Sequence, residues 1–251
     1  DYGVGKEDAE KIIVNFLQVI QDASDYLFSK NHADPYSWIG YICGYLRYHY
    51  PLEFITTALN IFEGKEEKSL AIIDFAKRKG LHISPIKFRH SIAQYSCDKE
   101  TNEIFKGISS IKYMNVNIAN EIYALREEQY DSFIELLYDL KEKTSVNTRQ
   151  LKILIDLDFF SEFGNEDYLT KCFELFEKYY GKKQIKKDSL AIAGIEENIV
   201  RPFAEKESEK MFSNINMKLF MIAYSKTIKG HVRSLGEKIM IQIEHLGYVD
   251  I

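Results

Sequence analysis

The fold of this chain depends most on one stretch, which reads Tyr26-Leu-Phe-Ser-Lys-Asn-His-Ala-Asp-Pro-Tyr-Ser-Trp-Ile-Gly-Tyr-Ile-Cys-Gly-Tyr-Leu-Arg-Tyr-His-Tyr-Pro-Leu-Glu-Phe-Ile-Thr-Thr-Ala-Leu-Asn60. It contains the only tryptophan and six of the seventeen tyrosines. Its polar turn, Ser29 to His32, offers a lysine, an amide and an imidazole, and these donors suit an anion such as phosphate. From the residues alone, a turn in which Ser29 or Asn31 caps the next helix is the plainer interpretation.

The composition favours a helical protein. Of the 251 residues, 45% are hydrophobic and 28% charged, as in ordinary folded proteins. Only four prolines and thirteen glycines interrupt the chain, which argues against a β fold with many turns. Short apolar segments separated by turn-forming residues occur only between residues 81 and 106. We therefore expect a mainly α, multi-helical fold with a small β element around 81–106.

The spacing of apolar residues predicts three regions. These are a helical region with the small β element over residues 1–106, a second region over 107–164, and a C-terminal helical region over 165–251. In the first region, Pro35 disfavours helical angles at the preceding residue, so we expect a break from Ser29 to Pro35 and a helix from Tyr36. In the last region we expect helices over residues 168–180, 190–200, 205–212 and 235–246.

Charge and cysteine content limit the setting and the partners. The net charge is -5, so no global field draws the chain to nucleic acid, and any such binding must come from a local patch. The three cysteines lack the paired spacing of a disulfide or zinc framework, which favours a reducing, cytoplasmic setting. No apolar span is long enough for a membrane helix, so we expect no membrane partner. The start at Asp1 suggests a piece of a longer chain.

Motifs for catalysis and metal binding are sparse. Asp156-Leu-Asp158 has a spacing that can hold a divalent metal, but it ends an apolar helical run and lacks a third carboxylate, which favours a capping or surface role. The six histidines form no metal-binding pair. No nucleophile elbow, Walker loop or dinucleotide fingerprint is present. The sequence thus predicts neither catalytic nor metal-ligating residues.

Several motifs follow one another in a fixed order. They read Tyr26-x-Phe28-x-Lys30-x-His32-Ala33, then Tyr36, then Ile39-x-Tyr41, then Tyr45-Leu46-Arg47-x-His49-Tyr50-Pro51-x-Glu53-Phe54. This order resembles the fingers segment of the bacterial C-family replicative DNA polymerases, the α subunits of DNA polymerase III. Three later segments are also similar to that family: Lys77 to Pro85, Phe105 to Lys112, and Val146 to Gly164. The resemblance covers about Glu7 to Gly164.

The resemblance implies a binding role. In such a polymerase, the residues matching Lys30, Asn31, His32, Tyr36 and Arg47 would face the incoming nucleotide or the template. The family has Asn and then Ser around the lysine, whereas this chain has Ser and then Asn. The carboxylates that hold Mg²⁺ lie in the family's palm, and no segment here resembles it. The resemblance therefore implies a fragment of a DNA-directed DNA polymerase that binds primer-template DNA and dNTP without itself carrying the catalytic palm.

The segment from Phe105 to Lys112 is similar to the family's lead into a helix-hairpin-helix. There the resemblance implies duplex contacts by Lys112 and Asn115. The family's Gly-x-Gly after the lysine is replaced here by Tyr113-Met-Asn115, and Tyr113 would obstruct the approach of backbone amides to a phosphate. Asn115 tolerates left-handed angles and is expected to preserve the turn.

Two further interpretations stay open. Asn216-Met-Lys-Leu-Phe220 is similar to the short Gln-x-x-Leu-Phe peptides that dock on a sliding clamp, although Asn replaces Gln and an amphipathic helix gives the same pattern. The alternative to a polymerase fragment is a helical protein–protein interaction scaffold that keeps only the polymerase packing pattern.

Overall fold

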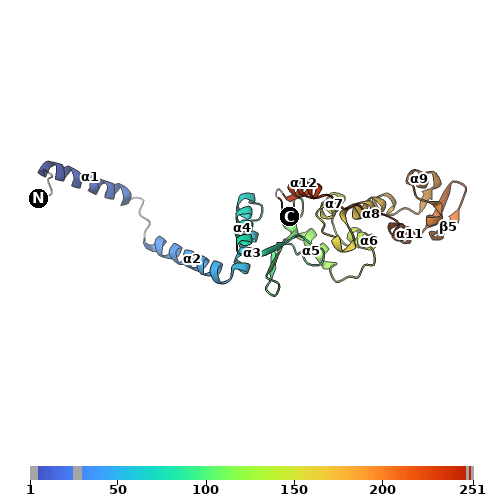
Figure 1. Ribbon diagram of the computed structural model, residues 1–251, viewed down its shortest axis with the longest axis horizontal. Coiled ribbons are helices and arrows are strands. Elements are labelled where there is room, and N and C mark those ends of the chain that lie inside the picture. The colour runs from blue at the N-terminus through green and yellow to red at the C-terminus, as the bar shows by residue number, and fades with distance from the viewer. Residues whose placement is uncertain (1–4, 25–29, 247–248, 250–251) are drawn as a thin grey trace. The chain divides into compact units, whose positions relative to one another are not determined.

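The computed structural model describes residues 5–24, 30–246 and 249; for Lys30, Asn31 and Glu66 it describes the backbone alone. The chain divides into two compact units, residues 1–54 and 55–251. Figure 1 shows the succession of elements along the chain. The described part is mainly α-helical, which confirms the predicted fold class, and it contains two small three-stranded sheets, of which only the first was predicted.

The first unit contains α1 (Lys6–Ser24) and α2 (Lys30–His49). Acidic Glu7 and Asp8 lie in the first turn of α1, where they favour the helix dipole. No residue of α1 is buried, and its large apolar side chains, such as Phe16, are exposed. The described aromatic residues of α2, Trp38 among them, are exposed as well. Both helices thus keep apolar surface that other residues of this unit do not cover.

The predicted break before Tyr36 is wrong. The helix α2 begins at Lys30 and contains Pro35, whereas Ser29 lies outside the described residues. Proline removes the hydrogen bond that its amide would donate to the residue four positions earlier. Here that acceptor is the carbonyl of Asn31 in the first turn, so a single bond near the helix start is lost and the rest of α2 continues. The helix α2 ends at His49, and Pro51 begins the next helix, a position that proline favours because its missing amide hydrogen has no acceptor there.

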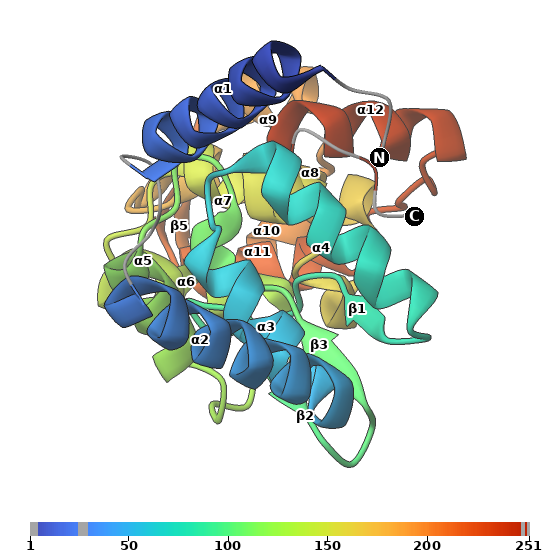
Figure 2. The same ribbon diagram turned by 90° about the vertical axis from the view of Figure 1, so that its left-hand side faces the viewer.

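Two helices and the first sheet come next, and the second unit begins within the first of these helices. The elements are α3 (Pro51–Ile61), α4 (Glu66–Arg78), β1 (His82–Ser84), β2 (Ser96–Asp98) and β3 (Glu103–Phe105). The central strand β3 pairs in parallel with β1 and antiparallel with β2, and α4 packs beside β1 (Figure 2). Asn60 ties α3 to the loop before β2, since its side chain exchanges two hydrogen bonds with the backbone of Tyr95. The β element expected around 81–106 is confirmed.

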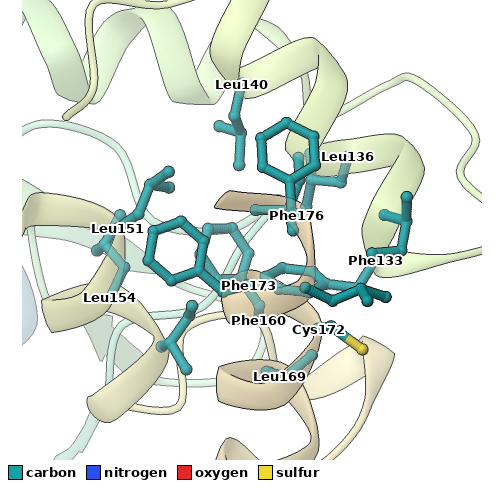
Figure 3. Close-up of a cluster of buried hydrophobic side chains, with 14 of the residues drawn as sticks. Phe133, Leu136, Leu140, Leu151, Leu154, Phe160, Leu169, Cys172, Phe173 and Phe176 are labelled. Atoms are coloured by element: carbon teal, nitrogen blue, oxygen red, sulfur yellow. The ribbon is translucent and has the colours of Figure 1, made fainter. Parts of the chain in front are cut away.

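The next elements form the largest apolar cluster. They are η1 (Ile108–Ser110), α5 (Val116–Ala124), α6 (Phe133–Lys143), α7 (Thr148–Asp156), η2 (Ser161–Phe163) and α8 (Glu166–Tyr179). Figure 3 shows Phe133, Leu154, Phe160 and Phe176 among the side chains that meet in this cluster. Both α6 and α7 begin with a complete capping box, on Ser132 and on Asn147 respectively. Caps and apolar faces thus specify the same helix boundaries.

The C-terminal elements differ in part from the sequence prediction. They are β4 (Gln184–Lys186), α9 (Lys187–Ile192), α10 (Glu197–Val200), η3 (Arg201–Phe203), β5 (Ala204–Glu207), β6 (Met211–Ile215), α11 (Met217–Ser225) and α12 (Leu235–Leu246). The helix predicted over residues 205–212 is wrong, because β5 and β6 form a hairpin there and β4 pairs with β6. In β6, Phe212 and Ile215 are buried, and the short polar turn between the strands lets their ladder form.

The helix predicted over residues 190–200 is also interrupted. Its two halves, α9 and α10, are separated at Gly194, which has a φ of 67°. A left-handed residue ends a helix, and glycine adopts that conformation without steric cost. The helices predicted over 168–180 and 235–246 are confirmed as α8 and α12.

Replacing Gly107 with alanine tests the close contact that precedes η1. A Cβ at this position would collide with the backbone of Ala93 and Gln94, which cannot move aside as a flexible side chain would. We expect Gly107→Ala to lower the free energy of unfolding by about 1–3 kcal/mol, the usual cost of overpacking, in urea denaturation. Gly236→Ala is the matched control, since open space surrounds Gly236. Equal stability of the two variants would contradict the contact.

An exposed ion-pair cluster predicts a pH dependence. Arg201 and Lys187 each donate to the carboxylate of Glu207, and they lower its pKa to about 2. A carboxyl with a depressed pKa stabilises the fold above its unfolded value near 4.5 and loses that contribution as the pH falls toward about 2. We expect Glu207→Gln to lower the urea midpoint most at neutral pH and progressively less between pH 4.5 and 3. A difference from wild type that is constant over pH 3–7 would contradict this.

Candidate nucleic-acid interface

A tight hairpin joins η1 to α5. The amide of Ile111 donates to the carbonyl of Ile108, and the amide of Met114 donates to the carbonyl of Ile111, so two turns follow each other. Tyr113, in the second turn, has a φ of 69°. The left-handed residue is thus Tyr113, and the expectation that Asn115 would take such angles is wrong. Asn115 is extended, with a φ of -140°, and its side chain accepts the amide hydrogen of Ile118 at 2.9 Å. It therefore acts as the N-cap of α5. The amides that precede Ile118 at the start of the helix have no acceptor within the helix.

The start of α7 holds the hairpin in place. The buried side chain of Gln150 donates to the carbonyl of Tyr113 at 2.7 Å and accepts from the amide of Asn147 at 3.0 Å. The guanidinium of Arg149 lies 3.6 Å from the centre of the Tyr113 ring, a cation–π contact. These contacts stabilise a conformation that costs an ordinary side chain roughly 1–2 kcal/mol. They also draw the Tyr113 ring onto α7.

Three cationic side chains line one pocket beside this hairpin. Lys112 comes from the hairpin, and Arg149 and Lys152 lie one turn apart on the exposed face of α7. Together with the aromatic ring of Tyr113, they form what we call the cationic patch: Lys112, Tyr113, Arg149 and Lys152. Paired cations near the start of a helix are suited to phosphate. The patch supplies the local positive charge that an acidic chain needs to bind a polyanion.

The opposite wall of the pocket comes from α12. Ile241, Glu244 and His245 line it, and the pocket has a volume of about 350 Å³. Lys112 Nζ donates to the carbonyl of Glu244 at 3.1 Å. Figure 1 shows α12 alongside α7. The space is large enough for a single phosphate group.

The two aspartates of Asp156-Leu-Asp158 have separate surroundings. Asp156 pairs with Arg233 at 2.7 Å and lies 3.8 Å from His245. Asp158 is left-handed, with a φ of 61°, and burial together with the charge of Glu166 raises its pKa. Within the described ranges, no group of three or more acidic, histidine or cysteine side chains is placed to hold a metal ion. The arrangement of Asp156 is that of an ion-paired structural residue.

The predicted site residues of the first unit lie along one helix. Lys30 and Asn31 begin α2, but their side chains lie outside the described part of the structure. His32 and Tyr36 are stacked, with ring centroids 6.2 Å apart. Arg47 lies fifteen residues after His32, so the helical rise places it about 22 Å further along the axis. The helix therefore does not bring Arg47 and His32 to a single phosphate.

The segment compared with clamp-docking peptides forms the start of α11. Asn216 caps the helix by accepting the amide hydrogen of Leu219 at 3.2 Å. Phe220 is fully buried and contacts the rings of Tyr179 and Tyr224. An anchor that is committed to the core cannot enter a partner's pocket. None of the helices in the described ranges is long and apolar enough to cross a membrane.

Sequence reasoning found Lys112 and Asn115 but missed the residues that surround them. Arg149, Lys152 and Asp156 are spaced three and four apart, which places them on one face of α7. That spacing was a usable signal for a charged helix face. The contribution of α12 had no such signal, since it lies more than 80 residues away in sequence.

Comparisons with known proteins point to the same region. The helix-hairpin-helix motif family matches residues 80–168. The DNA polymerase III subunit alpha of Bacillus subtilis (strain 168) is 30% identical over 142 residues, which is 56% of this chain and 12% of that protein. The corresponding subunit of Thermus aquaticus is 28% identical over 174 residues, or 68% of this chain and 14% of that protein. For Treponema pallidum (strain Nichols) the identity is 28% over 185 residues, covering 72% and 15%.

The chain thus spans less than one fifth of the length of the relatives it matches. The matched motif contains the hairpin at Tyr113, α5 and the cationic face of α7. Over the matched residues the chain is thus similar to the α subunits of bacterial DNA polymerase III, and residues 80–168 match the helix-hairpin-helix motif family.

Proposed function

We propose that this chain is part of a replicative DNA polymerase and that its helix-hairpin-helix region binds the backbone of primer-template DNA. The observation that carries the proposal is the convergence of Lys112, Arg149 and Lys152 on the hairpin beside the N-terminus of α5. Phosphate contacts from such groups position a protein on DNA without reading its sequence. Asn115 contributes by holding the helix start, since its side chain is used as a cap.

The backbone geometry supports phosphate binding despite the substitution of glycine by tyrosine. The ring of Tyr113 stacks with Arg149, so the Tyr113 side chain is held on α7. The first amides of α5 carry the positive end of the helix dipole, which favours an anion. The three cations add charge, and binding through them releases counterions and depends on salt.

The proposal extends to the helix α2 as a second contact surface. Lys30, Asn31, His32, Tyr36 and Arg47 would meet the template or the incoming dNTP in the polymerase, as the resemblance of this segment to the fingers implies. The separation of about 22 Å between His32 and Arg47 that the helical rise gives favours contacts to separate groups over joint binding of one phosphate. Nucleotidyl transfer with Mg²⁺ would be carried out by carboxylates of the palm, which none of these segments resembles. The division of the chain into regions 1–106, 107–164 and 165–251 is also part of this proposal.

The alternative of a protein–protein interaction scaffold rests on a different observation. Large apolar side chains of α1 and α2, including Phe16, Trp38 and Tyr41, are exposed. Contiguous exposed apolar surface commonly marks a contact with another part of a protein or assembly. A scaffold of this kind predicts no dependence of DNA affinity on the cationic patch.

Replacing Lys112 and Lys152 with alanine tests the DNA proposal. Each lysine that contacts a phosphate contributes about one unit to the slope of log affinity against log salt. We expect the double variant to bind a primer-template duplex roughly tenfold or more weakly at low salt and to lose about two units of slope. Fluorescence anisotropy over a salt series measures both quantities.

Lys206→Ala with Lys210→Ala is the matched control. Both lysines are exposed on the β5–β6 hairpin, away from the cationic patch, and their removal changes the net charge equally. An equal loss of affinity in the two double variants would show that binding follows the overall charge, and would contradict the assignment. Lys30→Ala with Arg47→Ala tests the contacts of α2 in the same assay.

A further inference from the structure

The last helix and the loop before it are attached to the second unit through polar contacts, one of which reaches the cationic patch. Lys112 donates to the carbonyl of Glu244, Arg233 pairs with Asp156, and Lys238 pairs with Glu166 at 2.9 Å. Burial alone would raise the pKa of Glu166, but the hydrogen bond from Lys238, a backbone amide and the charges of Lys238 and Arg233 together hold that pKa below its ordinary value. The contact of Lys112 with Glu244 joins α12 to the cationic patch, and the two ion pairs hold the helix and the preceding loop on α7 and α8.

Apolar packing of α12 is slight. No residue of the helix is buried, and only Ile241 and Leu246 pack against the apolar cluster of the second unit. On the outer face, Leu235 and Met240 are 61% and 66% exposed. Segments with few buried apolar contacts open at low free energy compared with the core. The attachment of α12 is therefore weaker than the packing among α6, α7 and α8.

The chain leading to α12 provides a pivot. The preceding loop is pinned to α8, because Lys171 donates to the carbonyl of Lys229 and the amide of His231 donates to Asp167. The helix carries its own N-terminal cap, in which Ser234 and Glu237 exchange hydrogen bonds. Only residues 232–234 lie between the pinned loop and the helix, so α12 can detach as a formed helix once the ion pairs of Arg233 with Asp156 and of Lys238 with Glu166 are broken.

We propose that α12 is a displaceable cover that competes with DNA for the cationic patch. The carbonyl of Glu244 occupies a donor of Lys112, and α12 forms one wall of the pocket that the three cations line. A duplex backbone that contacts all three cations would have to share this pocket with α12, so the two compete for it. A site that is open in one tenth of the molecules binds its ligand about tenfold more weakly than the open form does. This inference rests on the proposed DNA-binding function.

The test removes the apolar anchors of the cover without changing its charge. In the full chain, we expect Ile241→Ala with Leu246→Ala to increase amide hydrogen exchange in residues 235–246 and to tighten duplex binding about tenfold. Leu235→Ala with Met240→Ala is the matched control, because it removes similar groups from the exposed face of the same helix. It is expected to change neither quantity.

Arg233→Ala gives a second, opposed comparison. Loss of a positive charge by itself weakens DNA binding, whereas release of the cover strengthens it. We expect Arg233→Ala to bind the duplex more tightly than wild type. Adding Lys152→Ala to this variant, or to Ile241→Ala with Leu246→Ala, is expected to remove the gain in affinity. By linkage, DNA added to the wild-type chain should also increase exchange in α12.

Each result has a distinct meaning. Faster exchange in residues 235–246 without tighter DNA binding would contradict the proposed cover. It would also be contradicted if neither Ile241→Ala with Leu246→Ala nor Arg233→Ala increased exchange in these residues. If Lys112→Ala and Lys152→Ala leave DNA affinity unchanged in every background, the proposed DNA site itself fails. Exchange outside residues 226–246 that matches wild type shows that the core is intact.

Discussion

The hydrogen bond from Gln150 to the carbonyl of Tyr113 is the contact on which the candidate interface depends. Gln150 is buried at the start of α7, where the same side chain completes the capping box with Asn147. An amide donor and an amide acceptor are thus both used within the protein, as burial requires. One side chain fixes the start of α7 and the hairpin together, which sets the positions of Arg149 and Lys112 relative to each other.

The charge distribution explains how an acidic chain can present a cationic site. Many basic residues elsewhere are neutralised locally, as Lys187 and Arg201 are by Glu207. On α7, Arg149 instead faces an aromatic ring, which leaves its charge available to an anion from the open side. Net charge is therefore a poor guide to this protein, because the field at a surface is set by the groups within about 10 Å at ordinary salt.

Sequence reasoning succeeded where local signals and packing agree and failed where a longer-range contact decides. The small sheet at residues 82–105 and the helices α8 and α12 follow from periodicity and breakers. The strands β5 and β6 contain residues that also suit a helix, and their pairing with each other and with β4 decides the outcome. Likewise, Lys112 was visible in a motif, but its neighbour Glu244 is brought to it only by the fold.

The elements around the candidate interface are also held by contacts of different kinds, which respond differently to salt. Between α6, α7 and α8, large side chains such as Phe133, Leu154 and Phe176 are fully buried, and their apolar contacts change little with salt. The ion pairs that hold α12 and the loop before it, Lys238 with Glu166 and Arg233 with Asp156, are attractions between charges, so salt weakens them. Salt also weakens phosphate binding at the patch. Because the two attractions share Lys112 and oppose each other, the net salt dependence of DNA binding is smaller than the number of phosphate contacts alone would give.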